Sequence, residues 1–74
     1  MSKGFESLQH VVAARTKALR EAKGLSQEAL ALEADVDRTY VSQLERGIAN
    51  PSLRVLHQIA AILGVSVADL TQNG

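Results

Sequence analysis

The 74-residue sequence contains no cysteine, one proline and only two aromatic residues, Phe5 and Tyr40. The absence of cysteine excludes disulfide bonds and thiolate metal sites. With so few aromatic side chains, the core must be built from Leu, Val, Ile and Ala, a composition that favours packed helices over a β-sandwich. A chain of this length lies near the lower limit for a domain that folds alone, and such chains often gain stability by forming oligomers.

Long apolar stretches are also missing. The longest, residues 59–63, is far too short to cross a bilayer, and the N-terminal segment MSKGFESLQHVV lacks the continuous apolar run of a secretory signal. We therefore expect a cytoplasmic protein that does not associate with membranes.

The formal net charge is zero, which weighs against a polycation that coats nucleic acid without sequence preference, because phosphate attraction dominates such binding. The charges are unevenly placed, however. Basic residues gather between positions 15 and 23, acidic residues follow between 28 and 37, and Arg38 and Arg46 bracket one short segment. A local basic patch of this kind is compatible with sequence-specific binding.

Apolar residues recur at helical spacing in the first half of the chain. After an N-terminal end that we expect to be frayed, residues 1–4, the first helix is predicted from about Phe5 to Lys23, with Gly24 placed to end it. Ser26 can cap a second helix, and residues 34–36 form the predicted turn. Asp37 can cap a third helix, which Gly47 ends.

Further capping residues define the second half. Ser52 can cap a fourth helix that ends at Gly64, and Ser66 with Asp69 has the spacing of a capping box that opens a short fifth helix. We therefore predict an all-α fold, one compact five-helix domain over residues 1–74. Its helix-turn-helix would span about 26–46, and its C-terminal helices, about 53–71, would serve the core and dimerisation.

The third predicted helix has a narrow apolar face and a broad polar one. The polar side chains suit base edges in the major groove, where Arg binds guanine, Gln binds adenine and a Thr methyl contacts thymine. They lie along the first two turns, where a recognition helix contacts bases: Arg38, Thr39, Ser42 and Gln43. An ordinary solvated face would show the same periodicity, so spacing alone does not decide between the two.

Four motifs decide it together: LSQEALA, SQLERG, NPSL and LGVSVADL. At these spacings the chain, from the first helix to Leu70, resembles the Cro/repressor-type (XRE) helix-turn-helix family. The resemblance implies a lambda-repressor-like DNA-binding fold, base reading by Arg38, Thr39 and Gln43 with Ser42 as a further candidate, and a structural ion pair between Arg20 and Glu45. It also implies DNA phosphate contacts from Ser26, Gln27, Tyr40, Arg46 and Asn50. One departure is Asp35, where the family usually has Gly; we expect a small stability cost.

Within this family, the length and the RTYVSQLERG segment are most similar to the controller proteins of restriction-modification systems. Those proteins are homodimers that bind operators upstream of their own gene and of the endonuclease gene. The resemblance therefore implies a sequence-specific regulator that times endonuclease expression. A small phage-type repressor or an antitoxin is an alternative, and a helical protein-interaction adaptor is an alternative of another class.

One such domain contacts only a few base pairs, and each bidentate contact supplies about 1–3 kcal/mol of discrimination. We therefore expect a homodimer on pseudo-palindromic double-stranded DNA, with the recognition helices roughly 34 Å apart and further assembly on DNA left open. Apolar residues near the C-terminus would form the dimer interface or close the domain's own core: Leu53, Ile62, Val65, Val67 and Leu70.

Other sites are not indicated. His10 and His57 lie far apart and lack metal-ligand spacing. No nucleophile elbow, glycine-rich phosphate loop or paired-carboxylate motif is present. We therefore predict no enzymatic activity, no cofactor, no metal and no small-molecule ligand, which leaves DNA and a second copy of the chain as the predicted partners.

Overall fold

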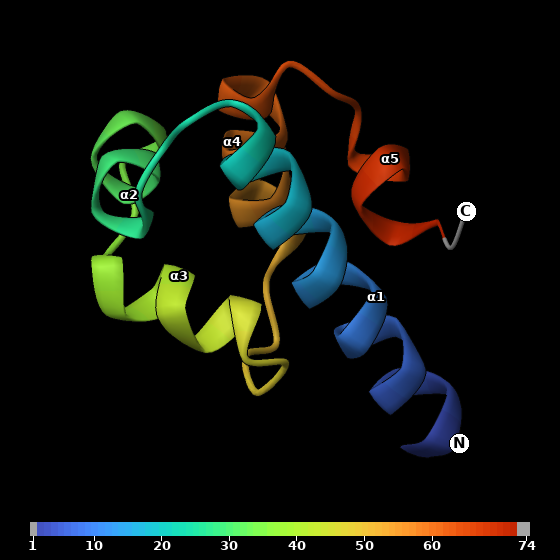
Figure 1. Cartoon of the computed structure of the whole chain (residues 1–74). Helices are drawn as coiled ribbons and strands as arrows, with labels where there is room; N and C mark the ends of the chain where they lie inside the picture. The colour runs from blue at the N-terminus through green and yellow to red at the C-terminus, as the bar shows by residue number, and fades with distance from the viewer. Residues whose placement is uncertain (1, 73–74) are drawn as a thin grey trace.

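The computed structural model describes residues 2–72, with side chains except at positions 2, 3, 5 and 6. The chain folds into five helices and has, over these residues, no strand (Figure 1). The helices are α1 (Ser2–Ala22), α2 (Gln27–Ala34), α3 (Arg38–Glu45), α4 (Leu53–Leu63) and α5 (Val67–Thr71). The all-α, five-helix prediction is confirmed.

The N-terminal helix begins earlier than expected. We expected residues 1–4 to be frayed, but α1 starts at Ser2, and Met1 lies outside the described residues. No proline interrupts this segment, and a glycine inside a helix, here Gly4, costs only about 1 kcal/mol. Once the packed part of α1 is formed, adding turns at its end requires no new nucleation, so the helix extends.

Side-chain caps fix where the other helices begin. The residue before each of α2, α3 and α4 accepts a hydrogen bond from a backbone N–H of the first helical turn. These residues are Ser26 before α2 (3.0 Å), Asp37 before α3 (2.7 Å) and Ser52 before α4 (3.1 Å). Ser66 and Asp69 form the predicted capping box of α5, and hydrogen bonds from Ser66 hold the pKa of the Asp69 carboxyl below its usual value. These contacts satisfy N–H groups that a helix start leaves unpaired.

The turn between α2 and α3 is built on Asp35. Its φ of 59° and ψ of 46° place it in the left-handed region, the one non-glycine residue with positive φ among those described. The next N–H, that of Val36, donates to the Ala31 carbonyl at 2.9 Å. This reversal brings α3 back against α2, as predicted for residues 34–36.

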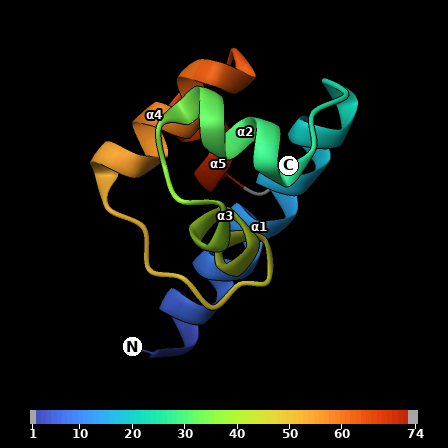
Figure 2. The ribbon, with the colours of Figure 1, turned by 90° about the vertical axis from the view of Figure 1, so that its left-hand side faces the viewer.

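The helices pack around a single apolar core. α2 packs on α3 and α4, while α1 packs on α3 and α5; Figure 2 shows α3 in front of α1, with α2 above it. The most deeply buried side chains come from all five helices: Thr16, Leu30, Val41, Leu44, Ile59 and Leu70. Helix α3 is therefore held by neighbours on two sides.

The structure divides the five interface candidates. Leu70 is 0 % exposed, so of the two roles expected for it, the structure shows closure of the domain's own core. The reason is that α5 docks on α1, where the Arg15 Nε donates to the Asp69 carbonyl at 2.8 Å. Leu53 is 78 % exposed. The remaining three are half-buried against the core: Ile62, Val65 and Val67.

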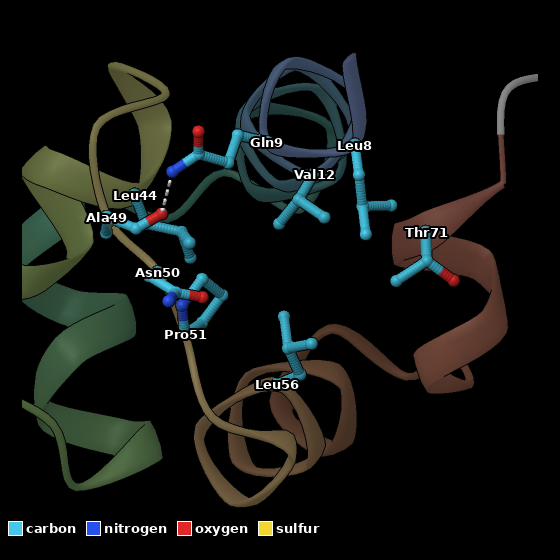
Figure 3. Close-up of a pocket in the computed structure, with 9 residues that line it drawn as sticks. All are labelled: Leu8, Gln9, Val12, Leu44, Ala49, Asn50, Pro51, Leu56 and Thr71. Carbon is cyan, nitrogen blue, oxygen red and sulfur yellow. Dashed lines mark hydrogen bonds between the residues drawn. The ribbon is translucent and has the colours of Figure 1, made fainter. Parts of the chain in front are cut away.

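A small cavity of about 70 Å³ lies between α1, α4, α5 and the segment that follows α3 (Figure 3). Leu8, Val12 and Leu56 contribute apolar walls. At its edge, the Gln9 Nε2 donates to the Ala49 carbonyl at 2.9 Å. This bond ties the connection between α3 and α4 to the first helix.

One buried polar group is unsatisfied. The Thr16 side chain in α1 is fully buried, and its Oγ1 has no hydrogen-bond partner among the described residues. A buried hydroxyl without a partner costs about 1–3 kcal/mol of desolvation. The methyl of the same side chain, in contrast, contributes to the core.

Replacing this hydroxyl by a methyl should stabilise the domain. We expect Thr16→Val to raise the free energy of unfolding by about 1 kcal/mol, because the unsatisfied group is removed and helix propensity hardly changes. Thr16→Ser keeps the hydroxyl and deletes the methyl, and should lower the free energy by about 1 kcal/mol. Urea unfolding followed by circular dichroism measures both; a Val variant less stable than the parent chain would contradict the assignment.

The conformation of Asp35 gives a second stability prediction. A non-glycine residue in the left-handed region lowers the free energy of unfolding by about 1–3 kcal/mol. Glycine avoids this strain, but its greater freedom in the unfolded chain lowers the free energy of unfolding by about 0.5–1 kcal/mol. We expect Asp35→Gly to raise the free energy of unfolding by about 0.5 kcal/mol and Asp35→Ala to lower it by about 1 kcal/mol. Thermal and urea unfolding should rank the three proteins Gly, Asp, Ala; the reverse order would show that the side chain stabilises the turn.

Candidate nucleic-acid interface

Helix α3, the predicted recognition helix, has one buried side and one open side. Val41 and Leu44 are 0 % and 2 % exposed and fix the helix on the core. On the other side, Arg38, Thr39 and Gln43 are exposed and Ser42 is half-buried. The structure thus brings the four predicted base-reading residues together on one short surface.

Four of the predicted phosphate-binding residues lie at the start of the helix-turn-helix or just after it in the chain. Ser26 and Gln27 lie at the start of α2, and Arg46 and Asn50 follow the end of α3. Ser26, Arg46 and Asn50 are exposed, whereas Gln27 is half-buried. The Ser26 Oγ already accepts its capping hydrogen bond, which leaves its O–H free to donate. Potential donors therefore lie at the start of α2 and in the segment that follows α3.

Tyr40 differs from the other candidates. Its side chain is half-buried and packs against the core. Burial raises the pKa of the Tyr40 phenol, and a hydrogen bond from the Ser52 backbone N–H opposes that rise. The hydroxyl therefore reaches the start of α4, where it accepts one bond and can still donate its own proton.

A buried ion pair joins the first and third helices. The Arg20 Nε and Nη2 donate to the two carboxylate oxygens of Glu45 at 2.6 and 2.9 Å, and the two side chains are 10 % and 3 % exposed. The hydrogen bond with Glu45 raises the pKa of Arg20, and its Nη1 also donates to the Leu25 carbonyl at 2.7 Å. The pair implied by the family resemblance is present in bidentate form.

Gln27 joins the same network. Its Nε2 donates to the Glu45 Oε1 at 3.1 Å, so one carboxylate holds α1, α2 and α3 together. The sequence gives no signal for this contact, because it joins the start of one helix to the end of another and helical periodicity describes single helices. We call Arg20, Gln27 and Glu45 the junction network.

Other kinds of site are not visible in the part of the chain that the structure describes. No three His, Asp or Glu side chains of residues 2–72 come together in a way that could hold a metal ion. Over the same residues, no helix combines the length and apolar character needed to cross a membrane.

Comparison with known proteins relates this arrangement to DNA-binding regulators. Control protein C.BamHI of Bacillus amyloliquefaciens is 50% identical over 46 residues, which cover 62% of this chain and 57% of that protein. The chain thus spans somewhat more than half the length of this relative. The restriction-modification controller protein C.AhdI of Aeromonas hydrophila superposes with a TM-score of 0.81 at 40% identity, over 84% of this chain and 94% of that one.

A DNA complex is among the structural neighbours. SinR, a master regulator for biofilm formation crystallised with DNA, superposes with a TM-score of 0.80 at 39% identity, over 82% of this chain and 98% of that one. The helix-turn-helix family model HTH_3 matches residues 17–70, and this range contains the caps, the turn at Asp35 and the junction network. The chain therefore belongs to the HTH_3 (XRE-type) helix-turn-helix family.

Proposed function

We propose that this protein is a sequence-specific transcriptional regulator of the restriction-modification controller type. The observation that carries the proposal is the open face of α3, which presents Arg38, Thr39 and Gln43 while Val41 and Leu44 anchor the opposite side. Names of relatives add support, since both C.BamHI and C.AhdI are described as control or controller proteins. A methyltransferase and an endonuclease gene beside this one would distinguish a controller from a phage-type repressor or an antitoxin.

In this proposal α3 enters the major groove. Arg38 grips a guanine edge, Gln43 an adenine edge, and the Thr39 methyl meets a thymine methyl; Ser42, being half-buried, approaches only from the edge. Donors on either side then fix the position of the helix without reading sequence: Ser26, Gln27, Tyr40, Arg46 and Asn50.

Two copies would bind a pseudo-palindrome. A single α3 reads too few base pairs for promoter selectivity, and two-fold pairing doubles the readout. Leu53 is 78 % exposed on α4, and the half-buried Ile62, Val65 and Val67 can add to the apolar contact. With Leu70 buried, we place the centre of the dimer contact at α4.

Selection from a pool of randomised duplexes tests the DNA-binding part. We expect the parent protein to enrich one sequence, and Arg38→Ala to reduce the preference for it over random DNA by roughly 10- to 100-fold, because a bidentate contact is lost. Arg38→Lys should lose most of this preference too, yet retain salt-dependent binding to random DNA, since lysine keeps the charge without the fork of donors. Full preference in both variants would show that Arg38 does not read bases.

Sedimentation velocity tests the dimer. We expect dimers at micromolar concentration, and Leu53→Glu should raise the dimer dissociation constant at least tenfold, because a charge is placed in an apolar contact. Leu32→Glu is the matched control, since Leu32 is a similarly exposed leucine, 81 % exposed, on α2 instead of α4. Equal effects of the two substitutions, or a parent protein that stays monomeric at 100-fold higher concentration, would exclude this interface.

A further inference from the structure

We infer that Glu45 is a positioning residue for DNA binding, which sets the orientation in which the Gln27 amide meets a phosphate. The inference rests on the proposed phosphate contact of Gln27. It adds that Glu45 determines the orientation of the Gln27 amide in this contact. Its basis is the hydrogen bond of 3.1 Å between the Gln27 Nε2 and the Glu45 Oε1. A stabilising role of the ion pair alone would not involve Gln27.

The chemistry of the carboxylate dictates how the amide is turned. An ionised carboxylate can only accept hydrogen bonds, whereas a glutamine amide has a donor end and an acceptor end. The end of Gln27 that faces Glu45 must therefore be Nε2, as observed. A phosphate oxygen is also an acceptor. The amide nitrogen carries two N–H groups, so one can stay on Glu45 while the other donates to DNA.

Glu45 is itself immobile enough to act as a reference point. Two hydrogen bonds from Arg20 hold both of its oxygens, and its side chain is only 3 % exposed. Arg20 is fixed in turn by the Leu25 carbonyl at 2.7 Å. The positive charge of Arg20 also offsets the negative charge of the Glu45 carboxylate. The carboxylate therefore repels a nearby phosphate less strongly.

The consequence is a preorganised contact at the start of α2. A side chain that is already ordered loses less entropy when it binds, which strengthens the contact without adding a new one. Because Glu45 is the last residue of α3, the same carboxylate also links the position of this phosphate contact to that of the recognition helix.

A double-mutant cycle tests the inference with the duplex that the parent protein selects from the randomised pool. Gln27→Met keeps the length of the side chain and removes its donors, and should weaken binding about tenfold. Glu45→Gln replaces the obligatory acceptor by a group that can donate or accept, so that Gln27 is no longer held in one orientation. We expect Glu45→Gln to weaken binding at least fivefold more in the parent background than in the Gln27→Met background.

Glu21→Gln is the matched control. Glu21 also lies beside Arg20, 3.9 Å from its Nη2, but its side chain is 59 % exposed. The Glu21→Gln substitution also removes a negative charge near Arg20. It should therefore change the affinity for DNA by the same factor in the parent and Gln27→Met backgrounds. General electrostatic effects of the lost charge cancel in each cycle.

Binding is measured at low temperature and corrected for the folded fraction. If Glu45→Gln does not fold, Glu45→Asp gives the same cycle, because aspartate keeps the charge beside Arg20 while its shorter side chain draws the carboxylate away from Gln27. If the substitution at position 45 weakens DNA binding equally in both backgrounds, the inference is overturned and the proposed function still stands. An unchanged DNA affinity of the Gln27→Met variant has the same consequence. A parent protein that selects no duplex would overturn the proposed function, and this inference with it.

Discussion

The buried pair of Arg20 and Glu45 is the constraint on which the DNA-facing surface depends. Removing two charges from water is costly, and a buried ion pair often adds little net stability even when its hydrogen bonds are complete. Here every carboxylate oxygen is used, and Arg20 donates to a backbone carbonyl as well. The pair therefore contributes mainly to the geometry of the fold, because its two hydrogen bonds fix the position and orientation of the end of α3 relative to α1.

Helix α3 needs contacts from the rest of the fold to hold it in place, because it is short. A helix of eight residues is marginal in water when isolated, so neither its formation nor its direction can come from its own backbone. Asp37 caps the start, Val41 and Leu44 anchor the middle, and Glu45 holds the end. Only the remaining face stays open, and it is the face that meets DNA in our proposal. In this proposal, the residues that hold α3 in place differ from those that read DNA, although both groups lie on the same two turns.

Local features of this fold could be predicted from the sequence, and contacts between distant segments could not. The caps at Ser26, Asp37 and Ser52 and the left-handed Asp35 follow from residue type and spacing within a few positions. The burial of Leu70 depends on how α5 docks on α1, and no periodicity within residues 67–71 reveals that. For the same reason the Gln27 contact was not predicted, whereas family resemblance supplied the pairing of Arg20 with Glu45.

The same contacts explain how a chain with zero net charge can present a surface suited to DNA. The carboxylate nearest the end of α3, that of Glu45, is buried and neutralised by Arg20. Asp37 binds an N–H at the start of the helix, where the helix dipole offsets a negative charge. Arg38 and Arg46 are left exposed at the two ends of α3. Attraction to phosphate therefore depends on which charges the fold leaves unpaired, and the total charge gives no measure of it.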